Sequence, residues 1–406
     1  GLWGPPGTGK TTAAEAIAKA LNRGYVKLNF GGASNASIVK GQNKSVPNAG
    51  PSLLMRELSR KSGTYSYVVN FDEFDKGTAE SYEAFHEFLD PVSESYYDEY
   101  LECNIPKNNF IIILTFNDIS RIPTPILDRM RLITVPGYSL TTKKKIVKNM
   151  VLESYAERLK VNNVSITDTA LDLLMREYSI ASGIRDVEKD IEKLLVRLIK
   201  KYNKYSDFCI TEDIIREVLG SKRTLGLSDM GNKAAVPGQA MALGVSGYIG
   251  SCIAVQVAED PYQKAEIEVC GLLKDACMES LSDAMSYARR TLKKELPKLH
   301  ISFRAPSIPK EGSSAGVAMY MAVMSCVLNK KLEGCAFTGS IDAFGNVGIV
   351  SVEEKLCAAE REGIARVYIP WDNYEYLREN KILDQYNVDI IPVKHVDELN
   401  SEFFEL

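Results

Sequence analysis

The sequence predicts an α/β core over residues 1–138, an α-helical subdomain over 139–220 and an α+β domain over 236–406. Three observations predict this order. A glycine-rich loop at 4–11 runs directly into a helix-forming segment, a pattern typical of phosphate-binding α/β folds. Amphipathic helical periodicity then dominates the middle of the chain. Strand-like and helix-like segments follow without a regular βαβ order, and the non-periodic stretch 221–235 before them is the candidate linker.

The composition excludes several classes of protein. A chain of 406 residues should hold two or three domains, because single cores rarely exceed about 250 to 300 residues. The net charge of -4 does not favour nucleic-acid binding. No apolar run approaches the ~20 residues that span a bilayer, so no membrane segment is expected. Eight cysteines without a CxxC pair argue against zinc and disulfides, and we expect a cytoplasmic location, with the mitochondrial matrix as the alternative.

The first motif is "GPPGTGKT", which matches GxxxxGK[ST]. Backbone N–H groups of such a loop can curl around phosphate oxygens, Lys10 adds a positive charge, and Thr11 can hold Mg²⁺. The simpler alternative is a glycine-rich turn ahead of a helix. Only about three residues precede the loop, where a strand is needed, so we expect further residues upstream in the natural protein. The candidate nucleotide-binding residues here are Gly4, Pro5, Pro6, Gly7, Thr8, Gly9, Lys10, Thr11 and Thr12.

Two predicted buried strands follow, and each ends in polar side chains. "YSYVVNFDEFDK" delivers Asp72 to a magnesium ion and Glu73 to an attacking water. "NFIIILTFN" ends in Asn117, which can orient water near a γ-phosphate. A plain acidic strand end is the alternative for the carboxylates, but the phosphate loop favours a magnesium site made by Thr11 and Asp72.

Two arginines are further candidates. Arg129 could be supplied to the nucleotide of a neighbouring subunit, or it could form a local ion pair with Asp128. Arg185 falls in the first turn of a predicted helix for which Ser182 is a plausible cap, and a surface charge is its alternative. The basic run at 143–145 lies on a helix whose other face is apolar, so a solvated surface is favoured over nucleic-acid binding.

The stretch "PKEGSSAGVAMYMAVMSCVL" at 309–328 places Ser313 and Ser314 on a glycine-rich corner before an apolar helix. A serine there can cap the helix, or it can act as a nucleophile whose oxyanion is stabilised by the helix N-terminus. There is no GxSxG elbow. None of the three histidines has a motif around it, so the base is sought among the lysines.

If 351–362 is helical, Lys355 lies on its apolar stripe, whereas Glu360 and Arg361 point elsewhere. Desolvation lowers the pKa of an amine toward the range in which it can accept a proton. Such a lysine suits the base of a Ser-Lys pair. From the residues alone, a Lys355 that snorkels beside a merely capping Ser314 is an equally good interpretation.

Taken in order, these motifs resemble an AAA+ ATPase. "FLDPVSESYYDEYLECNIPKNNFIIILTFND", "PKEGSSAG", "TGSIDAFGNV" and "EKLCAAEREG" are similar specifically to Lon proteases. The resemblance implies an α/β AAA+ core with an α-helical lid, followed by an α+β Lon-type peptidase domain. It also implies that Ser314 is the nucleophile, that Lys355 is the general base with Thr338 bonded to the pair, that Arg129 is an arginine finger and that Arg185 is sensor 2.

The resemblance further implies ATP and Mg²⁺ as cofactors, a homohexamer, and unfolded or misfolded proteins as substrates. The function expected from it is ATP-dependent endopeptidase activity. Two alternatives are a Lon-like remodelling ATPase with weak or absent peptidase activity and a DNA-acting AAA+ motor. The acidic net charge speaks against the motor.

Three departures from the family pattern bear on these expectations. Residues of "IVSV" replace the Gly-Gly before the lysine helix, with an apparent one-residue deletion. Gln256 falls where the family generally has a glutamate near the catalytic pair. Val46 stands at the position of the aromatic that grips substrate in the central pore, and valine offers less contact area. Weak or specialised translocation follows as a hypothesis.

Overall fold

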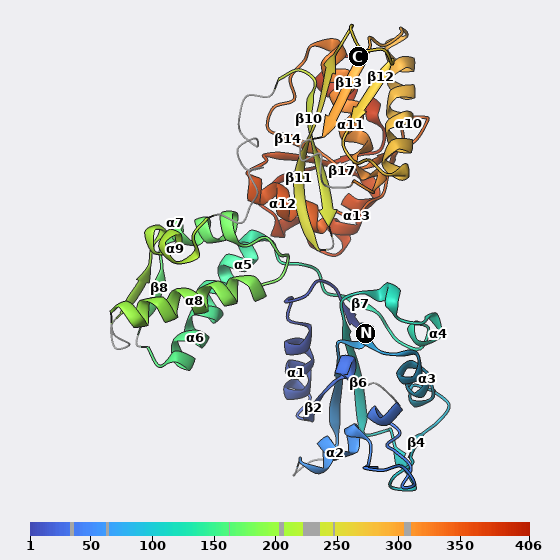
Figure 1. Cartoon of the computed structure of the whole chain (residues 1–406), viewed down its shortest axis with the longest axis vertical. Coiled ribbons are helices and arrows are strands. Elements are labelled where there is room, and N and C mark those ends of the chain that lie inside the picture. Colours follow the sequence, from blue (N-terminus) through green and yellow to red (C-terminus); the bar gives the residue numbers. More distant parts are fainter. Residues whose placement is uncertain are drawn as a thin grey trace. The chain divides into compact units, whose positions relative to one another are not determined.

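The computed structural model describes residues 1–32, 36–61, 65–161, 163–202, 207–221, 236–246, 248–303 and 310–406. Nearly all of the predicted linker, 222–235, therefore lies outside the described residues. The chain divides into two compact units, Gly1–Gly137 and Tyr138–Leu406 (Figure 1). Each unit is described by itself.

The first unit is built on a five-stranded sheet in the order β2-β3-β6-β1-β7, and every pairing in it is parallel. Its strands are β1 (Leu2–Trp3), β2 (Gly24–Asn29), β3 (Tyr67–Asp72), β6 (Phe110–Phe116) and β7 (Ile133–Thr134). β3 and β6 confirm the two predicted buried strands. In a parallel sheet the carboxyl ends of neighbouring strands meet at one edge, where ligands bind.

Helices and a hairpin surround this sheet. The helices are α1 (Lys10–Ala20), α2 (Leu53–Ser59), α3 (Ala79–Phe88) and α4 (Thr124–Leu127), with 3₁₀ turns at Phe30–Gly32, Ala36–Ile38, Phe74–Lys76 and Ile119–Arg121. β4 (Ser95–Asp98) and β5 (Cys103–Pro106) form an antiparallel hairpin. Between α3 and the sheet, the rings of Phe30, Phe71, Phe74 and Phe85 pack edge to face or tilted, which anchors the segment after β3.

The second unit begins with helices, called here the helical part (140–219) and drawn in green in Figure 1. It contains α5 (Leu140–Ile146), α6 (Leu152–Leu159), α7 (Asp168–Leu173), α8 (Arg185–Lys201) and α9 (Glu212–Leu219). π-helical turns at Val147–Val151 and Leu174–Tyr178 continue α5 and α7. β8 (Val164–Ile166) and β9 (Phe208–Ile210) pair in parallel. The helices share one apolar core around Tyr178 and Leu194.

The rest of the second unit, called here the sheet part (236–406), is built on a mixed seven-stranded sheet in the order β12-β13-β11-β10-β14-β17-β18. Its strands are β10 (Gln239–Ser246), β11 (Ile249–Glu259), β12 (Ile267–Cys270), β13 (Leu299–Phe303), β14 (Cys335–Phe337), β17 (Arg366–Pro370) and β18 (Asp389–Val393). β11 is antiparallel to both β10 and β13, and the other pairings are parallel. A small hairpin of β15 (Ser340–Ile341) and β16 (Val347–Gly348) follows β14.

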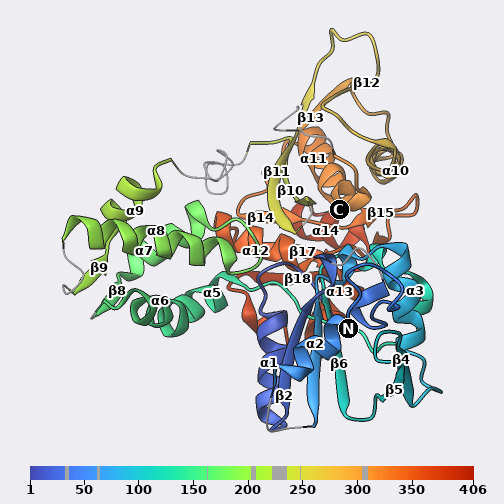
Figure 2. The same ribbon diagram turned by 60° about the horizontal axis from the view of Figure 1, so that its bottom comes forward.

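Two groups of helices cover the two faces of this sheet (Figure 2). α10 (Asp275–Leu292), α11 (Gly316–Leu328) and α14 (Val396–Phe403) share one apolar core with the strands. α12 (Glu353–Glu362) and α13 (Trp371–Glu379) share another, in which Leu356 and Cys252 are buried. Short 3₁₀ turns lie at Ser313–Ala315 and Leu383–Gln385.

α11 confirms the prediction that the apolar run after Ser314 is a helix rather than a strand. It is buried from Gly316 to Ser325 without interruption, because α10 and the sheet enclose it. Across the described ranges, no helix combines the length and the apolar character needed to cross a membrane.

Candidate active sites

The phosphate-loop motif lies between β1 and α1. Gly9 caps α1 in the left-handed conformation (φ 81°), which glycine adopts without steric cost. The buried amine of Lys10 donates hydrogen bonds to the carbonyls of Gly4 and Pro5 at 2.8 and 2.6 Å, and to Asn117 Oδ1 at 2.9 Å. The loop, a positive charge and the polar residue after β6 therefore meet at the carboxyl edge of the sheet, where an anion would be favoured.

Asp72 ends β3 next to the loop. Thr11 Oγ1 lies 3.3 Å from each of its carboxylate oxygens. Thr115 Oγ1 donates to Asp72 Oδ1 at 2.6 Å, and Lys27 Nζ pairs with Asp72 Oδ2 at 2.6 Å. Burial opposes ionisation of this carboxyl, but the hydrogen bonds from Lys27 and Thr115 outweigh it and hold its pKa below the usual range. The group is thus a carboxylate at neutral pH.

Thr11 and Asp72 suit a magnesium ion. Mg²⁺ is usually held by one or two carboxylates, a hydroxyl, water and the phosphates of the substrate rather than by an all-protein cage. The described residues contain no group of three or more His, Cys, Asp or Glu side chains that could hold a metal ion.

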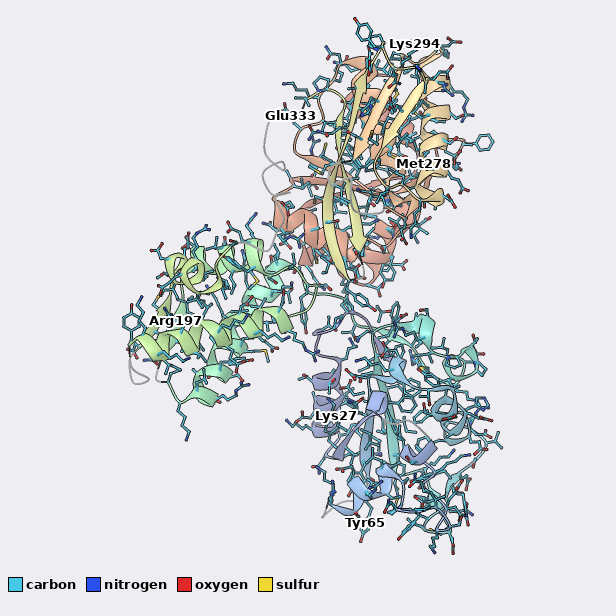
Figure 3. All side chains as sticks on the ribbon, viewed as in Figure 1. Lys27, Tyr65, Arg197, Met278, Lys294 and Glu333 are labelled. Atoms are coloured by element: carbon cyan, nitrogen blue, oxygen red, sulfur yellow. The ribbon has the colours of Figure 1, made fainter. Side chains whose placement is uncertain are left out.

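Sequence reasoning missed Lys27 and Thr115. Thr115 stands directly opposite Asp72 in the β3–β6 register, so strand pairing is the signal that would have found it. Lys27 lies on β2 and is labelled in Figure 3. Its contact with Asp72 depends on side-chain reach across the sheet, for which the sequence carries no signal.

Glu73 and Asn117 are held by short local contacts. Glu73 adopts the left-handed backbone conformation (φ 55°), which is uncommon for a residue other than glycine and often marks a functional site. Its carboxylate pairs with Lys76 at 2.8 Å. Asp75 Oδ2 accepts hydrogen bonds from the backbone N–H groups of Asn117 and Asp118 at 3.2 and 3.0 Å, which ties the end of β6 to the turn after β3.

The two arginines lie in different units. Arg129 is half-buried just after α4, and its guanidinium donates to the carbonyl of His86 on α3. Within the described residues it makes no ion pair with Asp128, the local alternative left open by the sequence. Arg185 is exposed at the first residue of α8. The expected cap was wrong: Ile184 precedes the helix, and Ser182 Oγ donates to Tyr248 O at 2.9 Å instead.

Ser314 lies in the 3₁₀ turn directly before α11. Two neighbouring segments hold this turn by its carbonyl groups. Ser280 Oγ on α10 donates to the carbonyl of Ser313 at 3.1 Å. The carbonyl of Ser314 accepts from Gly339 N at 3.0 Å and from Thr338 Oγ1 at 3.3 Å. The hydroxyl is thus carried on a backbone that is fixed on both sides.

Lys355 is 2% exposed, as its place on the apolar stripe of α12 predicted. Its amine donates to Thr338 Oγ1 at 2.8 Å. Burial lowers the pKa of the amine to about 8, although the charge of Glu354 partly offsets this. Because the one hydroxyl proton of Thr338 is directed at the Ser314 carbonyl, a neutral amine keeps its lone pair free to accept a proton. Thr338 therefore joins Lys355 to the segment that carries Ser314.

The opposite face of α12 is also buried, which the sequence did not predict. Glu360 and Arg361 lie off the apolar stripe but do not reach solvent, because the helical part packs on this face. Leu140 N donates to Glu360 Oε2 at 2.9 Å, and Arg361 Nη2 donates to the carbonyl of Gly250 at 2.9 Å. The expectation of a solvated basic run also fails for Lys143, which is buried in the same region.

Two departures from the family pattern can be placed. Val46 is 46% exposed in the loop 41–50, where valine presents a small apolar surface to solvent. Gln256 is exposed on β11 opposite Gln239 and Ser302. α12 packs against the other end of that strand, at Gly250. The suggestion that Gln256 removes a charge beside Lys355 is therefore not supported.

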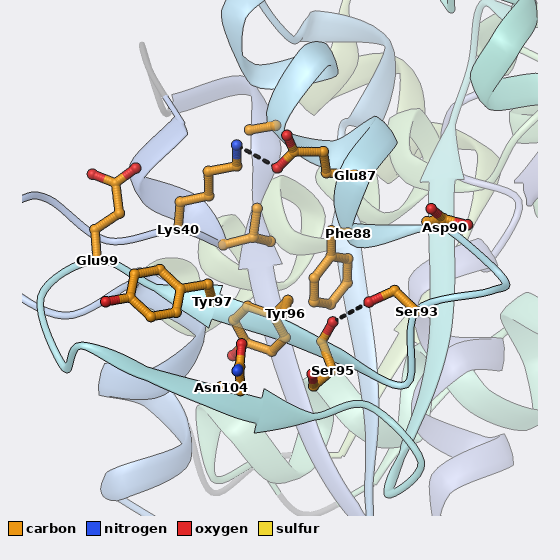
Figure 4. Close-up of a pocket in the computed structure, with 12 residues that line it drawn as sticks. Lys40, Glu87, Phe88, Asp90, Ser93, Ser95, Tyr96, Tyr97, Glu99 and Asn104 are labelled. Carbon is orange, nitrogen blue, oxygen red and sulfur yellow. Dashed lines mark hydrogen bonds and ion pairs between the residues drawn. The ribbon is translucent and has the colours of Figure 1, made fainter.

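A cavity of about 390 Å³ lies elsewhere on the first unit, between α3 and the β4–β5 hairpin (Figure 4). Phe88, Tyr96 and Tyr97 form part of its wall, and an ion pair joins Lys40 to Glu87 beside it. None of the candidate nucleotide-binding or catalytic residues is among the described residues that line it. The cavity is thus separate from the phosphate loop.

Comparison with protein families gives two matches. Residues 209–405 match the Lon protease (S16) C-terminal proteolytic domain, and residues 1–138 match the ATPase family associated with various cellular activities. The chain is 32% identical to the Lon protease of Clostridium beijerinckii, over 99% of the chain and 52% of that protein. It is 31% identical to that of Escherichia coli (strain K12), over 98% and 53%. The identity to that of Mycoplasma mobile is 29%, over 99% and 50%. The chain thus spans about half the length of these relatives.

Proposed function

Since this chain belongs to the Lon protease family, we propose that it carries the ATPase and peptidase parts of an ATP-dependent serine endopeptidase. The observation that supports this most is the hydrogen-bonded series from Lys355 through Thr338 to the Ser314 segment. A buried lysine of lowered pKa, linked through Thr338 to the segment of a serine that precedes a helix, suits a Ser-Lys hydrolase.

In the proposed reaction, Ser314 Oγ attacks the carbonyl carbon of a peptide bond while its proton passes to the neutral amine of Lys355. The ammonium then gives that proton to the leaving amine as the C–N bond breaks. In a second step, water attacks the acyl ester while its proton passes to Lys355, which returns the proton to Ser314 Oγ as the ester bond breaks. The dipole of α11 and backbone N–H groups of the turn before it would stabilise the oxyanion, because the N–H groups of Gly316 and Val317 already donate to the carbonyls of Ser313 and Gly339.

The first unit is proposed to bind ATP and Mg²⁺. An AAA ATPase domain implies nucleotide binding, and the residues from Gly4 to Thr12 are the proposed phosphate cradle. Thr11 and Asp72 would hold the magnesium ion, which neutralises phosphate charge. Glu73 would activate the attacking water, with Asn117 orienting it. Arg185 would sense the nucleotide of its own subunit.

The proposed assembly and setting follow from the same resemblance. Arg129 would reach the nucleotide of a neighbouring subunit, which implies a homohexameric ring, and the substrates would be unfolded or misfolded proteins. A reducing compartment such as the cytoplasm suits the eight cysteines, all of which lie in the described part of the chain as free thiols.

Matched variants of the full-length protein test this function. Ser314→Ala and Lys355→Ala should each lower cleavage of casein and of a short fluorogenic peptide by at least roughly 10³-fold, with ATP hydrolysis retained. Glu73→Gln should abolish ATP hydrolysis and casein degradation. Ser313→Ala is the control and should keep both activities. A wild-type protein that hydrolyses ATP but cleaves neither substrate would overturn the proposal and point to a remodelling ATPase.

A further inference from the structure

α12 makes contacts of two kinds within the second unit. Toward the sheet it places Lys355, whose amine bonds to Thr338. Toward the helical part it places Glu360, which is 7% exposed. Both residues belong to the same short helix, Glu353–Glu362, and a helix of this length moves as a rigid rod. A shift of one residue is therefore carried to the other.

The Glu360 carboxylate uses both oxygens on the helical part. Oε2 accepts from the backbone N–H of Leu140 at 2.9 Å, and Oε1 accepts from Thr141 Oγ1 at 3.1 Å. These residues form the first turn of α5. A carboxylate there meets backbone N–H groups that have no partner inside the helix, and it complements the helix dipole. Hydrogen bonds to an ionised group are the strong ones, the more so when water is excluded.

Two further polar contacts across this region go to backbone carbonyls of the sheet part. Arg176 Nη1 donates to the carbonyl of Arg361 at 3.2 Å, and Ser182 Oγ donates to that of Tyr248 at 2.9 Å. Cys357 Sγ contributes a longer contact to the carbonyl of Tyr138, at 3.4 Å. Glu360 is thus the charged side chain of α12 that fixes its position relative to α5.

We infer that Glu360 is a positioning residue for Lys355. Its hydrogen bonds to the first turn of α5 fix the position of α12. The arrangement of the helical part therefore determines whether the amine of Lys355 lies within reach of Ser314. The inference rests on the proposed function, because it assigns Lys355 to catalysis. It also gives a physical route by which the helical part, which carries the proposed nucleotide sensor Arg185, acts on the peptidase site.

The test uses the full-length protein with Glu360→Gln, Glu360→Ala and the control Glu379→Gln, an exposed glutamate at the end of α13. Cleavage of a short fluorogenic peptide is measured with and without ATP. Active sites are counted with a serine-reactive fluorophosphonate, so that rates refer to folded protein. The ratio of the cleavage rate with ATP to the rate without ATP is also unaffected by a loss of folded protein, because both rates are measured on the same protein preparation.

The Glu360→Ala variant should lower kcat per titrated site roughly tenfold or more, since small displacements of a catalytic group cost this much. KM should stay unchanged, and the stimulation by ATP should fall toward one. The Glu360→Gln variant should lie between, because its amide can still bond to Leu140 N and to Thr141 Oγ1 but lacks the negative charge that strengthens both bonds. Thr141→Val, which removes one donor only, should resemble Glu360→Gln. ATP hydrolysis by the Glu360 and Thr141 variants should match that of wild type. The Glu379→Gln control should match wild type in every measurement.

An unchanged kcat per site together with an unchanged ATP stimulation in Glu360→Ala would overturn the inference. A wild-type protein that cleaves the peptide equally fast with and without ATP would also overturn it. Failure of the proposed function looks different. In that case Ser314→Ala or Lys355→Ala keeps peptide cleavage, whatever Glu360 does.

Discussion

The lowered pKa of Lys355 makes peptide cleavage dependent on pH. The amine must be neutral to accept the proton of Ser314, and its pKa of about 8 means that the neutral fraction grows as pH rises through 8. With a short peptide and saturating ATP, kcat should therefore be small at pH 6.5, reach half its maximum near pH 8 and level off above about pH 9. A kcat that falls across this range would contradict the assignment of Lys355 as the base.

The control for this prediction is Glu353, two positions before Lys355 on the same helix. Burial, and then the charge of Glu354, raise the pKa of Glu353 to about 7, so it titrates in the same range. The Glu353→Gln variant removes that titration and should leave the rise near pH 8 in place. If the rise disappears with Glu353, the pH dependence belongs to the carboxyl and not to the amine.

At the residue scale, side chains within a motif were predictable and their partners were not. The burial of Lys355 follows from its spacing on one helix, which the sequence displays directly. Thr115 and Lys27 contact Asp72 from other strands. Ser182 was expected to cap α8, but its hydroxyl donates to the carbonyl of Tyr248 instead. Such contacts depend on which segments become neighbours, and that is settled by tertiary packing.

At the scale of elements, the contact between α12 and β11 depends on Gly250. A β-carbon there would lie 1.8 Å from the carbonyl oxygen of Glu354 and 3.1 Å from Ala358 Cβ. The Gly250→Ala variant should push α12 from the strand, lower the stability by about 1–3 kcal/mol or more and reduce peptide cleavage. Urea denaturation and the peptide assay would check this.

The neighbouring strand offers a matched control for that substitution. At Gly244 on β10 a β-carbon would meet only the ends of the Ile253 and Ser251 side chains, at 3.2 and 3.4 Å. These can shift at small cost, so Gly244→Ala should stay close to wild type in both measurements. Equal losses in the two variants would count against a specific role of the α12–β11 contact.

The loop 41–50 is the second element with a measurable consequence. Backbone hydrogen bonds from Val46 N to Asn43 O at 3.0 Å and from Gln42 N to Gly50 O at 3.1 Å shape it, and the valine side chain is exposed. If this loop grips substrate, Val46→Tyr should speed the degradation of a tagged folded protein a few-fold, because an aromatic ring offers more contact area. Peptide cleavage and ATP hydrolysis by the Val46→Tyr variant serve as controls, because a loss of either activity would indicate unspecific damage to the protein. Equal degradation rates would show that the loop does not grip the chain.

Most elements were predictable because their signals are local. β3 and β6 are short apolar runs followed by polar residues, and α11 is an apolar run too long for a strand. The second buried face of α12 was not predictable. It is covered by α5, which lies far away in the sequence and contributes a backbone N–H rather than a recognisable side-chain pattern.

At the scale of the whole molecule, the proposed role of Arg129 predicts complementation between subunits. Arg129→Ala and Lys10→Ala should each lower ATP hydrolysis, by roughly 10³-fold for the arginine. When the two variants are mixed and reassembled, a Lys10→Ala subunit can still lend its arginine to a neighbour with an intact phosphate loop. Partial recovery of ATP hydrolysis is expected. Its absence in proven mixed rings would favour a structural role for Arg129 at the His86 carbonyl.

The alkylation rate of the buried thiol of Cys252 reports local opening of the second unit. It lies in the apolar core shared by β11 and α12, and burial raises its pKa to about 12, so alkylation must wait until the helix lifts away. The exposed Cys103, Cys209 and Cys270 supply the unprotected reference rate. Iodoacetamide labelling followed by mass spectrometry would thus measure how often α12 separates from β11. The Glu360→Ala variant should raise the alkylation rate of Cys252 and leave the rates of the three reference thiols unchanged.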